Sequence, residues 1–325
     1  MKRNTLRLVG GALLLACGLG AHAQNGAFPN QPVKWVVPYA PGGTTDVIAR
    51  NLATRMGQDL GQPVVVDNKP GAASIIGATF IARSQPDGYT VGTADSGTLA
   101  FNPAMYASLS YDAGKDFTFI GGLGKMPLVL AVAPSFPAKN VQELLALVKK
   151  SPGSISSASS GPGSPLHVAL ELFKQRTGTD LMHVPYKGSA PALQDLMAGQ
   201  VQTMFVDLPP SLSMIKGGKI RVLAVATPQR LSILPDVPTM AEAGVPGFEA
   251  YAWQGFVGPA KLPDAVVQRL SKDLVAALKH PEMRARLEEL GIQPMPMAPA
   301  QFTEFVRSEQ KLWSGVIKAA NIRLD

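Results

Sequence analysis

Short apolar segments alternate along most of the chain with stretches in which apolar residues recur every three or four positions. The short segments predict buried strands at residues 32–37, 63–68, 89–96, 154–159, 181–186, 201–207 and 220–227. The stretches between them predict amphipathic helices at residues 76–84, 140–153, 164–178, 190–199 and 211–218. This alternation is typical of α/β units with mostly parallel sheets.

Two of the predicted helices carry clear end signals. Asn140 is a good N-cap, and Glu143 follows at the position of a capping box. Ser164 caps the next helix, with Pro165 in its first turn and Gly178 as its stop. After residue 260 the pattern is mostly helical, which predicts a helical C-terminal region with apolar faces that include Val266, Leu270, Leu274, Leu278, Phe302, Phe305, Val306, Trp313 and Ile317.

The first 23 residues have the build of a secretory signal peptide. Three cations precede a short apolar run, and Ala21-His22-Ala23 forms a small-x-small cleavage site before Gln24. We therefore expect a periplasmic protein. A second interpretation is that Leu14–Cys17 is a lipobox and that Cys17 carries a lipid. After cleavage at Ala23 the chain would contain no cysteine, because Cys17 is the only one, and would have no disulfide or thiolate chemistry.

Composition fits a two-domain globular protein. The chain has 325 residues, of which 46% are hydrophobic and 16% charged. Loss of the leader, with three cations and no acid, would lower the formal net charge from +7 to +4. Lys and Arg are scattered, and their densest groups lie beside acids on predicted helices, as in Glu282–Gly291. This pattern indicates solvated helix faces and not a nucleic-acid surface.

Four loops that follow predicted strands are rich in glycine, alanine, serine and threonine. They lie at residues 40–46, 68–78, 159–167 and 186–191. Each comes before a helix, where unpaired backbone N–H groups and the helix dipole favour an anion. Any one such loop is ordinary turn chemistry. Four of them, divided between the two halves of the chain, predict a site at the carboxyl edges of two sheets.

Other chemistries have less support. No phosphate-binding glycine motif is present, and no cofactor is predicted. His167, His183 and His280 lack metal-ligand spacing, so no metal is predicted. A hydrolase would need a triad such as Ser164, His167 and Asp207. The first two lie one helical turn apart, which favours local capping, and no nucleophile-elbow motif exists.

Several long motifs resemble the substrate-binding proteins of tripartite tricarboxylate transporters, the Bug receptors. They are "VPYAPGGTTDVIAR", "VVVDNKPGAAS", "PDGYTVG", "HVPYKGSAPALQDLMAGQV", "LAVATPQRLSILPDVPTMAEAGVPGFE" and "LGIQPMPMAPAQFTEFVRSE". The resemblance covers essentially the whole chain after the leader. It implies a two-domain periplasmic binding protein of type II-like architecture that closes like a clamp on a small carboxylate and passes it to a membrane permease. It implies no enzymatic activity.

The resemblance also implies a set of ligand-binding residues. In such receptors, loops of both domains hold carboxylates largely through main-chain N–H groups and ordered water. The corresponding positions here are Tyr39, Gly43, Thr44, Thr45, Ala72, Ala73, Ser74, Ser96, Ser160, Ser164, His167, Lys187, Gly188 and Asp207. Many relatives have Gly-Ala-Gly-Gly where this chain has Gly71-Ala72-Ala73-Ser74, which narrows that wall of the site.

The implied chain path crosses between the domains near residues 124–132 and 251–259. Domain 1 would comprise residues 24–126 and 251–325, and domain 2 residues 127–250. We expect a monomer that binds no nucleic acid. Two alternatives stay open: a receptor of the same build that feeds a sensor kinase, and a hydrolase on the same scaffold.

Overall fold

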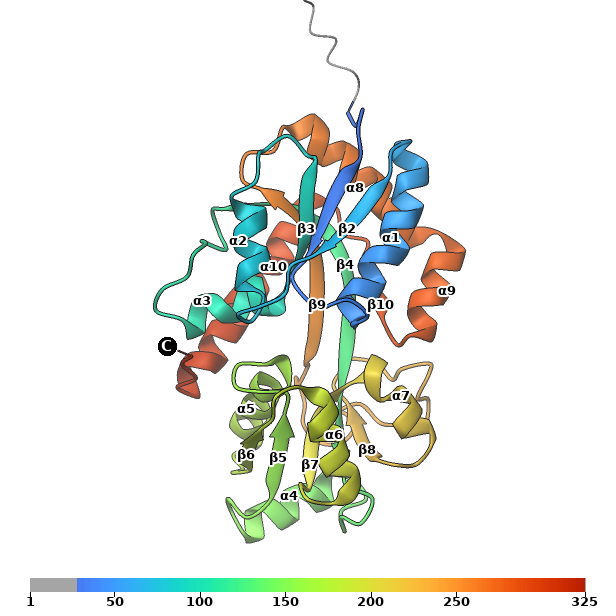
Figure 1. The fold of residues 1–325 in the computed structure, drawn as a ribbon. Coiled ribbons are helices and arrows are strands. Elements are labelled where there is room, and N and C mark those ends of the chain that lie inside the picture. Colours follow the sequence, from blue (N-terminus) through green and yellow to red (C-terminus); the bar gives the residue numbers. More distant parts are fainter. Residues whose placement is uncertain (1–27, 325) are drawn as a thin grey trace, which may run out of the picture.

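The computed structural model describes residues 28–324, and these form two lobes joined by two long strands (Figure 1). Both long strands run through the junction: β4 (Phe117–Val132) passes from the upper lobe into the lower one, and β9 (Tyr251–Pro259) returns. The predicted crossings at 124–132 and 251–259 thus lie in β4 and β9. The exact domain limits stay a prediction. The proposed leader and its cleavage site lie outside the described residues.

The upper lobe is built from the two ends of the described chain. Its elements are β1 (Val33–Val37), α1 (Thr44–Leu60), β2 (Val64–Asn68), α2 (Ile75–Ala82), β3 (Thr90–Asp95), the π-helical turn η1 (Gly97–Phe101), α3 (Asn102–Met105), α8 (Asp264–Lys279), α9 (Pro281–Glu289), β10 (Gln293–Pro294) and α10 (Pro299–Ala319). The lower lobe holds α4 (Val141–Lys150), β5 (Ser156–Ser159), α5 (Pro165–Thr177), β6 (Met182–Pro185), α6 (Ser189–Ala198), β7 (Thr203–Asp207), α7 (Leu208–Lys216) and β8 (Arg221–Val225).

The sheet is mixed, and this corrects the expectation of mostly parallel sheets. The strands run in the order β2-β1-β3-β9-β4-β7-β5-β6, with β8 and β10 also on β4. The pairs β1–β2, β1–β3, β5–β6 and β5–β7 are parallel, as the alternating pattern predicts. Every pair made by β4 or β9 is antiparallel. The reason is geometric: one strand leaves the upper lobe and the other returns to it.

Local sequence signals place the helix ends. The Asn140 side chain accepts a hydrogen bond from the Glu143 N–H at 2.9 Å and starts α4. The Ser164 hydroxyl accepts one from the His167 N–H at 3.3 Å and starts α5, which ends at Gly178 in a left-handed conformation. Both predicted caps are confirmed. None of the helices within residues 28–324 is long and apolar enough to cross a membrane.

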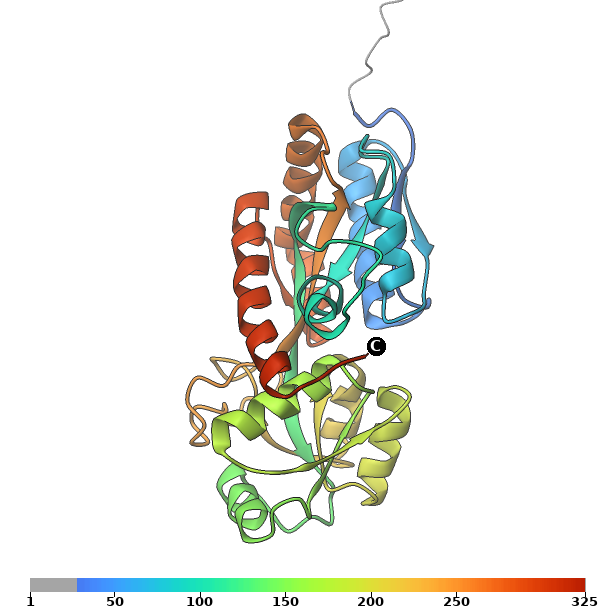
Figure 2. The same ribbon diagram turned by 90° about the vertical axis from the view of Figure 1, so that its left-hand side faces the viewer.

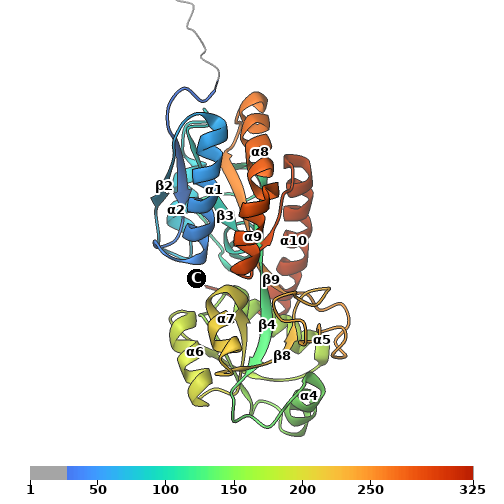
Figure 3. The ribbon, with the colours of Figure 1, turned by 90° about the vertical axis from the view of Figure 1, so that its right-hand side faces the viewer.

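Apolar side chains of the strands and the covering helices form the core. In the upper lobe, the ring of fully buried Trp35 lies 4.2 Å from that of Phe256. In the lower lobe, Phe173, Phe205 and Phe248 pack on one another. Helix α10 runs along one side of the molecule, and the chain after it turns into the space between the lobes (Figure 2). On the opposite side, α9 faces α7 across the junction (Figure 3).

Candidate ligand-binding site

The carboxyl ends of both sets of parallel strands face the junction between the lobes (Figure 1). Strands β1, β2 and β3 are neighbours, so the loops that follow them lie together under the upper lobe. Strands β7, β5 and β6 are also neighbours, and their loops lie together on the lower lobe. The structure therefore gathers the predicted residues into two groups that face each other across the gap, at the sheet edge where α/β proteins bind ligands.

A network around Asp46 fixes the first loop. The Asp46 carboxylate accepts hydrogen bonds from the Gly42 N–H, from Arg50 Nε and from Asn68 Nδ2, each at 2.9 Å. Asn68 also donates to the Tyr39 carbonyl at 3.0 Å. Burial acts to raise the pKa of Asp46, but the hydrogen bonds from Arg50, Gly42 and Asn68 lower it to about 2. Asp46 therefore holds the loop in shape, and its donors leave it no role as a direct ligand.

The special backbone position in this loop is Gly42 and not Gly43. Gly42 has φ +83°, whereas Gly43 has φ −76°, which any residue can adopt. The backbone conformation of Gly43 therefore does not require a glycine. A Cβ added at Gly43 would meet only the Ala40 carbonyl oxygen, at 3.7 Å. Gly43 thus has room on the protein side, and both glycines are exposed toward solvent.

Buried polar groups lie directly behind the first loop. The Thr45 hydroxyl accepts a hydrogen bond of 2.7 Å from Gln254 Nε2 on β9. Gln254 Oε1 and Ser96 Oγ are buried and have no hydrogen-bond partner among residues 28–324. Such buried groups ordinarily bind ordered water. Sequence reasoning missed Gln254, although a glutamine inside an apolar strand was a usable signal.

The second loop has an unusual backbone. Ala72, Ala73 and Ser74 have φ values of +45°, +48° and +72° in succession. A left-handed conformation costs a residue with a side chain roughly 1–2 kcal/mol, so the fold must hold this turn in place. The Asn102 side chain donates to the Ala73 carbonyl at 3.1 Å, and the Ser74 and Thr98 hydroxyls lie 2.8 Å apart. These contacts orient the loop toward the gap.

Asp95 joins the first and third strands at this edge. Its carboxylate accepts from the Tyr39 hydroxyl at 2.5 Å and from the N–H and hydroxyl of Thr98, both at 2.8 Å. Burial, followed by the charge of Asp95, raises the pKa of Tyr39 well above its usual range. Tyr39 therefore stays a neutral donor that is already engaged. Tyr39 is among the residues predicted from the sequence, and Asp95 is not.

The lower-lobe loops are joined through their backbones. The Gly188 N–H donates to the Ser160 carbonyl at 3.2 Å, and the Ser159 carbonyl accepts from the Tyr186 N–H at 3.0 Å. Gly188 has φ +114°, which requires a glycine before α6. The exposed side chain of Lys187 extends from the same loop. Ser160, Lys187 and Gly188 are thus brought together, as predicted.

His167 supports the third loop and pairs with a second histidine. Its Nδ1 accepts from the Gly163 N–H at 3.1 Å, so the proton of the neutral ring is on Nε2. The His183 ring stacks on it at 3.8 Å and lies 2.7 Å from the Ser159 hydroxyl. Burial, and then nearby positive charge, lowers the pKa of each to about 4. Both rings are therefore neutral near pH 7. The spacing of these histidines in the sequence gives no sign that their rings stack.

The triad required by the hydrolase alternative is not assembled. Ser164 Oγ receives the His167 backbone N–H, and His167 Nδ1 receives the Gly163 N–H. Within the described range, no hydrogen bond joins Asp207 to either residue, and no group of three or more His, Cys, Asp or Glu residues could hold a metal ion.

The cations near the gap are engaged elsewhere or lie at its rim. Arg50 binds Asp46. Lys69 Nζ lies 3.3 Å from Asp67 and 4.4 Å from the centre of the Phe80 ring. No side-chain cation of the described residues is thus built into the upper loops as an anion ligand. Donors at this edge are backbone N–H and hydroxyl groups.

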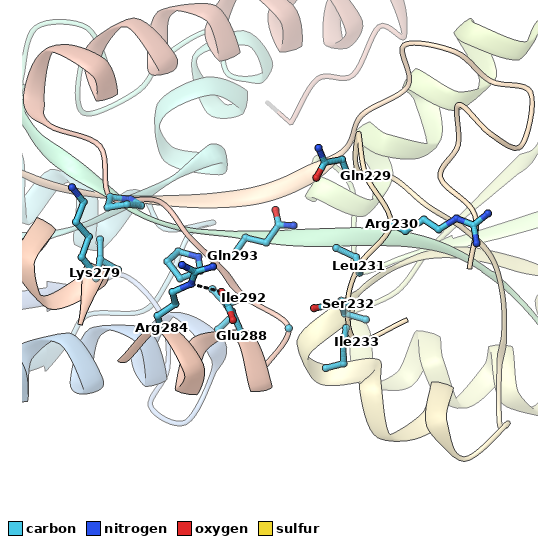
Figure 4. A pocket seen from close by; sticks show the side chains of 15 residues that line it. Gln229, Arg230, Leu231, Ser232, Ile233, Lys279, Arg284, Glu288, Ile292 and Gln293 are labelled. Carbon is cyan, nitrogen blue, oxygen red and sulfur yellow. Dashed lines mark hydrogen bonds and ion pairs between the residues drawn. The ribbon is translucent and has the colours of Figure 1, made fainter. Parts of the chain in front are cut away.

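A separate cavity of about 660 Å³ lies at the flank of the junction (Figure 4). The loop Gln229–Ile233 lines one side of it, and the ends of α8 and α9 with β10 line the other. None of the predicted ligand-binding residues lines this cavity. Its arginines are paired, Arg284 with Glu288 at 2.7 Å and Arg230 with Glu242 at 2.9 Å. The paired arginines make it a poor match for an anion.

Two α/β lobes, joined by crossing strands and facing each other with glycine-rich loops, are the architecture of a periplasmic binding protein. The sequence profile of the tripartite tricarboxylate transporter family receptors matches residues 48–322. The chain belongs to this family.

Individual relatives agree over nearly the full length. The chain is 34% identical to protein BugT of Bordetella pertussis, with 100% of both chains covered. It is 36% identical to R. palustris Rpa4515, solved with adipate, with a TM-score of 0.82 over 91% of this chain and 99% of that one. MatC of Rhodopseudomonas palustris, solved with bound malate, is 34% identical, with a TM-score of 0.77 over 89% of this chain and 100% of that one.

Proposed function

We propose that the protein is a periplasmic receptor that captures a small organic carboxylate between its lobes and delivers it to a membrane transporter of the tripartite tricarboxylate type. The observation that carries this proposal is the set of loops at the carboxyl ends of both sheets. They present backbone N–H and hydroxyl donors, and the two cations beside the upper loops, Arg50 and Lys69, are already engaged. The adipate and malate carried by two similar structures support the ligand class.

The energetics of such a site suit reversible capture. A charge-assisted hydrogen bond contributes about 1.5–3 kcal/mol net. About four to six of them, less the cost of ordering and closure, reach the roughly −8 kcal/mol of micromolar binding. Ser96 Oγ and Gln254 Oε1 would hold an ordered water between the protein and the ligand, since neither has a protein partner among the described residues.

The proposal also covers export and chain organisation. The N-terminal leader would be removed after Ala23, and domain 1 (24–126 and 251–325) would close on domain 2 (127–250) around the ligand. Mass spectrometry of the protein from the periplasm tests the leader. A chain that begins at Gln24 is expected, and a lipid on Cys17 would contradict it.

Two substitutions test the mode of binding by titration calorimetry with the carboxylate that a thermal-shift screen selects. Gly43→Val adds a branched side chain beside the N–H donors, where the protein itself leaves room. We expect ligand binding to be lost while the unliganded protein keeps nearly its full stability. Lys69→Ala should bind like the parent, because Lys69 contacts Asp67 and Phe80. If Gly43→Val binds normally and Lys69→Ala does not, a side-chain cation holds the carboxylate and the proposed mode is wrong.

A further inference from the structure

Asp207 is an anomaly in a site for anions. It ends β7, the strand between β4 and β5, and thus lies beside the ligand loop that follows β5. Its carboxyl group is half-buried, does not cap α7, and has no hydrogen bond or ion pair within residues 28–324. A carboxylate without donors is costly to keep partly out of water.

The side chain of Asp207 lies on the face of β7 that α5 covers, and it does not line the flanking cavity. The next residue, Leu208, lines the cavity shown in Figure 4, whereas Asp207 does not. Phe205, two residues earlier and on the same face as Asp207, packs against Phe173 of α5. Asp207 therefore lies on the α5 face of β7, and α5 begins at the third ligand loop.

We infer that Asp207 makes this site select carboxylates that carry a hydrogen-bond donor, an ammonium or hydroxyl group, in preference to plain dicarboxylates. The inference rests on the proposed function and specifies its ligand class. The loops of both lobes supply donors for carboxylate oxygens. Asp207 supplies an acceptor, which a donor group on the ligand would satisfy and which a second bare carboxylate would leave unpaired. A ligand that leaves this partly buried carboxylate without a partner is rejected more strongly than one added contact would favour another ligand.

The titration of Asp207 gives the selection a pH signature. Burial raises the pKa of Asp207 to about 6, and no charged neighbour contributes. Three other groups have pKa values away from pH 6: those of His167 on α5 and His183 on β6 are about 4, and that of Asp46 in the upper lobe is about 2. Above about pH 6 the carboxylate favours an ammonium or hydroxyl group. Below about pH 6, the protonated Asp207 carboxyl can donate a hydrogen bond to a ligand carboxylate, so a plain dicarboxylate can bind.

The test is calorimetry from pH 5 to pH 8 with aspartate, malate and succinate, which share one carbon skeleton, and with the same substitutions on longer chains. At pH 8 the parent should bind amino- or hydroxy-substituted acids at least tenfold more tightly than the matched plain diacid. The gap should narrow as the pH falls through about 6. Asp207→Asn should lose most of this preference and should keep or increase its thermal stability, because a partly buried charge is removed.

The control is Asp236→Asn, which removes the same charge from an exposed position in the lower lobe and should leave the preference unchanged. A parent that prefers plain diacids at pH 8, or an Asp207→Asn protein with an undiminished preference, overturns the inference but leaves the receptor function standing. A parent that binds no carboxylate of any length would instead overturn the proposed function.

Discussion

At the scale of single residues, backbone conformation and a few side-chain contacts fix the shape of the two upper loops. In the first loop, Gly42 makes the turn with a positive φ, and Gly43 beside it has an ordinary backbone conformation. The sequence around Ala73 does not indicate three left-handed residues in a row, because that conformation depends on contacts with Thr98 and Asn102, which follow only after α2 and β3. Tertiary partners such as these cannot be inferred from a local pattern.

We expect the hydrogen-bond network around Asp46 to stabilise the folded protein in a pH-dependent way. The pKa of Asp46 is about 2 in the folded protein, below its usual value of 3.8, so the unfolded chain binds the proton more tightly. The stabilisation is therefore fully present above about pH 4 and is lost as the pH falls toward 2. A difference of nearly two pKa units corresponds to about 2 kcal/mol.

Urea unfolding at several pH values between 5 and 2 checks this expectation with Asp46→Asn. The substitution should lower the free energy of unfolding at pH 7 by about 2 kcal/mol and remove the matching part of the pH dependence. Asp87→Asn, an exposed acid in the loop before β3, serves as the control. If the free energy of unfolding depended on pH equally in the parent and in Asp46→Asn, the hydrogen-bond network around Asp46 would not stabilise the fold.

At the scale of elements, helices and strands were largely predictable because caps and apolar patterns are local. The predicted end signals at Asn140, Ser164 and Gly178 are all found. The crossing strands were harder. Residues 117–123 of β4 contain two adjacent glycines, which do not indicate a strand. Their strand structure depends on pairing with β9, which is far away in the sequence. The glycines are there because a Cβ at Gly122 would come within 2.6 Å of Met295.

One buried carboxylate attaches the C-terminal helix to the crossing strand. Glu309 of α10 accepts from the Tyr251 hydroxyl at 2.9 Å and from the indole N–H groups of Trp253, at 2.6 Å, and Trp313, at 2.9 Å. Three donors on one buried acid form a fully satisfied network. The network holds α10 against β9 at the point where β9 enters the upper lobe.

Glu309→Gln should therefore destabilise the protein by about 2–4 kcal/mol, because an amide has one acceptor oxygen and brings donors that face other donors. Thermal unfolding followed by tryptophan fluorescence measures the loss, since Trp253 and Trp313 contact the substituted group. Glu304→Gln, on the exposed side of the same helix, should change stability by less than about 0.5 kcal/mol. A loss of that small size for Glu309→Gln would show that the network contributes little.

At the scale of the whole molecule, the two lobes touch beside the ligand loops. The tail after α10 belongs to the upper lobe, where the Leu324 N–H donates to the Met105 carbonyl at 3.1 Å. A Cβ added at Gly163, in the third ligand loop of the lower lobe, would lie 2.8 Å from the Leu324 side chain and 2.7 Å from Met105 Sδ. The end of the chain thus contacts a loop that we propose closes on the ligand, an arrangement that no sequence pattern predicted.

Removing the Leu324 side chain should therefore shift the lobes toward the open form. A ligand that binds the closed form then has a lower apparent affinity, by the fraction of closed protein that is lost. We expect Leu324→Ala to weaken carboxylate binding about two- to fivefold, the effect of roughly 0.4–1 kcal/mol of lost contact.

The melting temperature of the unliganded protein should hardly change, because Leu324 is only half-buried. Small-angle scattering should show a larger radius of gyration without ligand and the parent value with saturating ligand. Leu312→Ala removes an equally large and more exposed side chain from α10 and should change neither quantity. If Leu324→Ala binds as tightly as the parent, the tail is a passive end of the chain, and closure depends on the loops and the crossing strands alone.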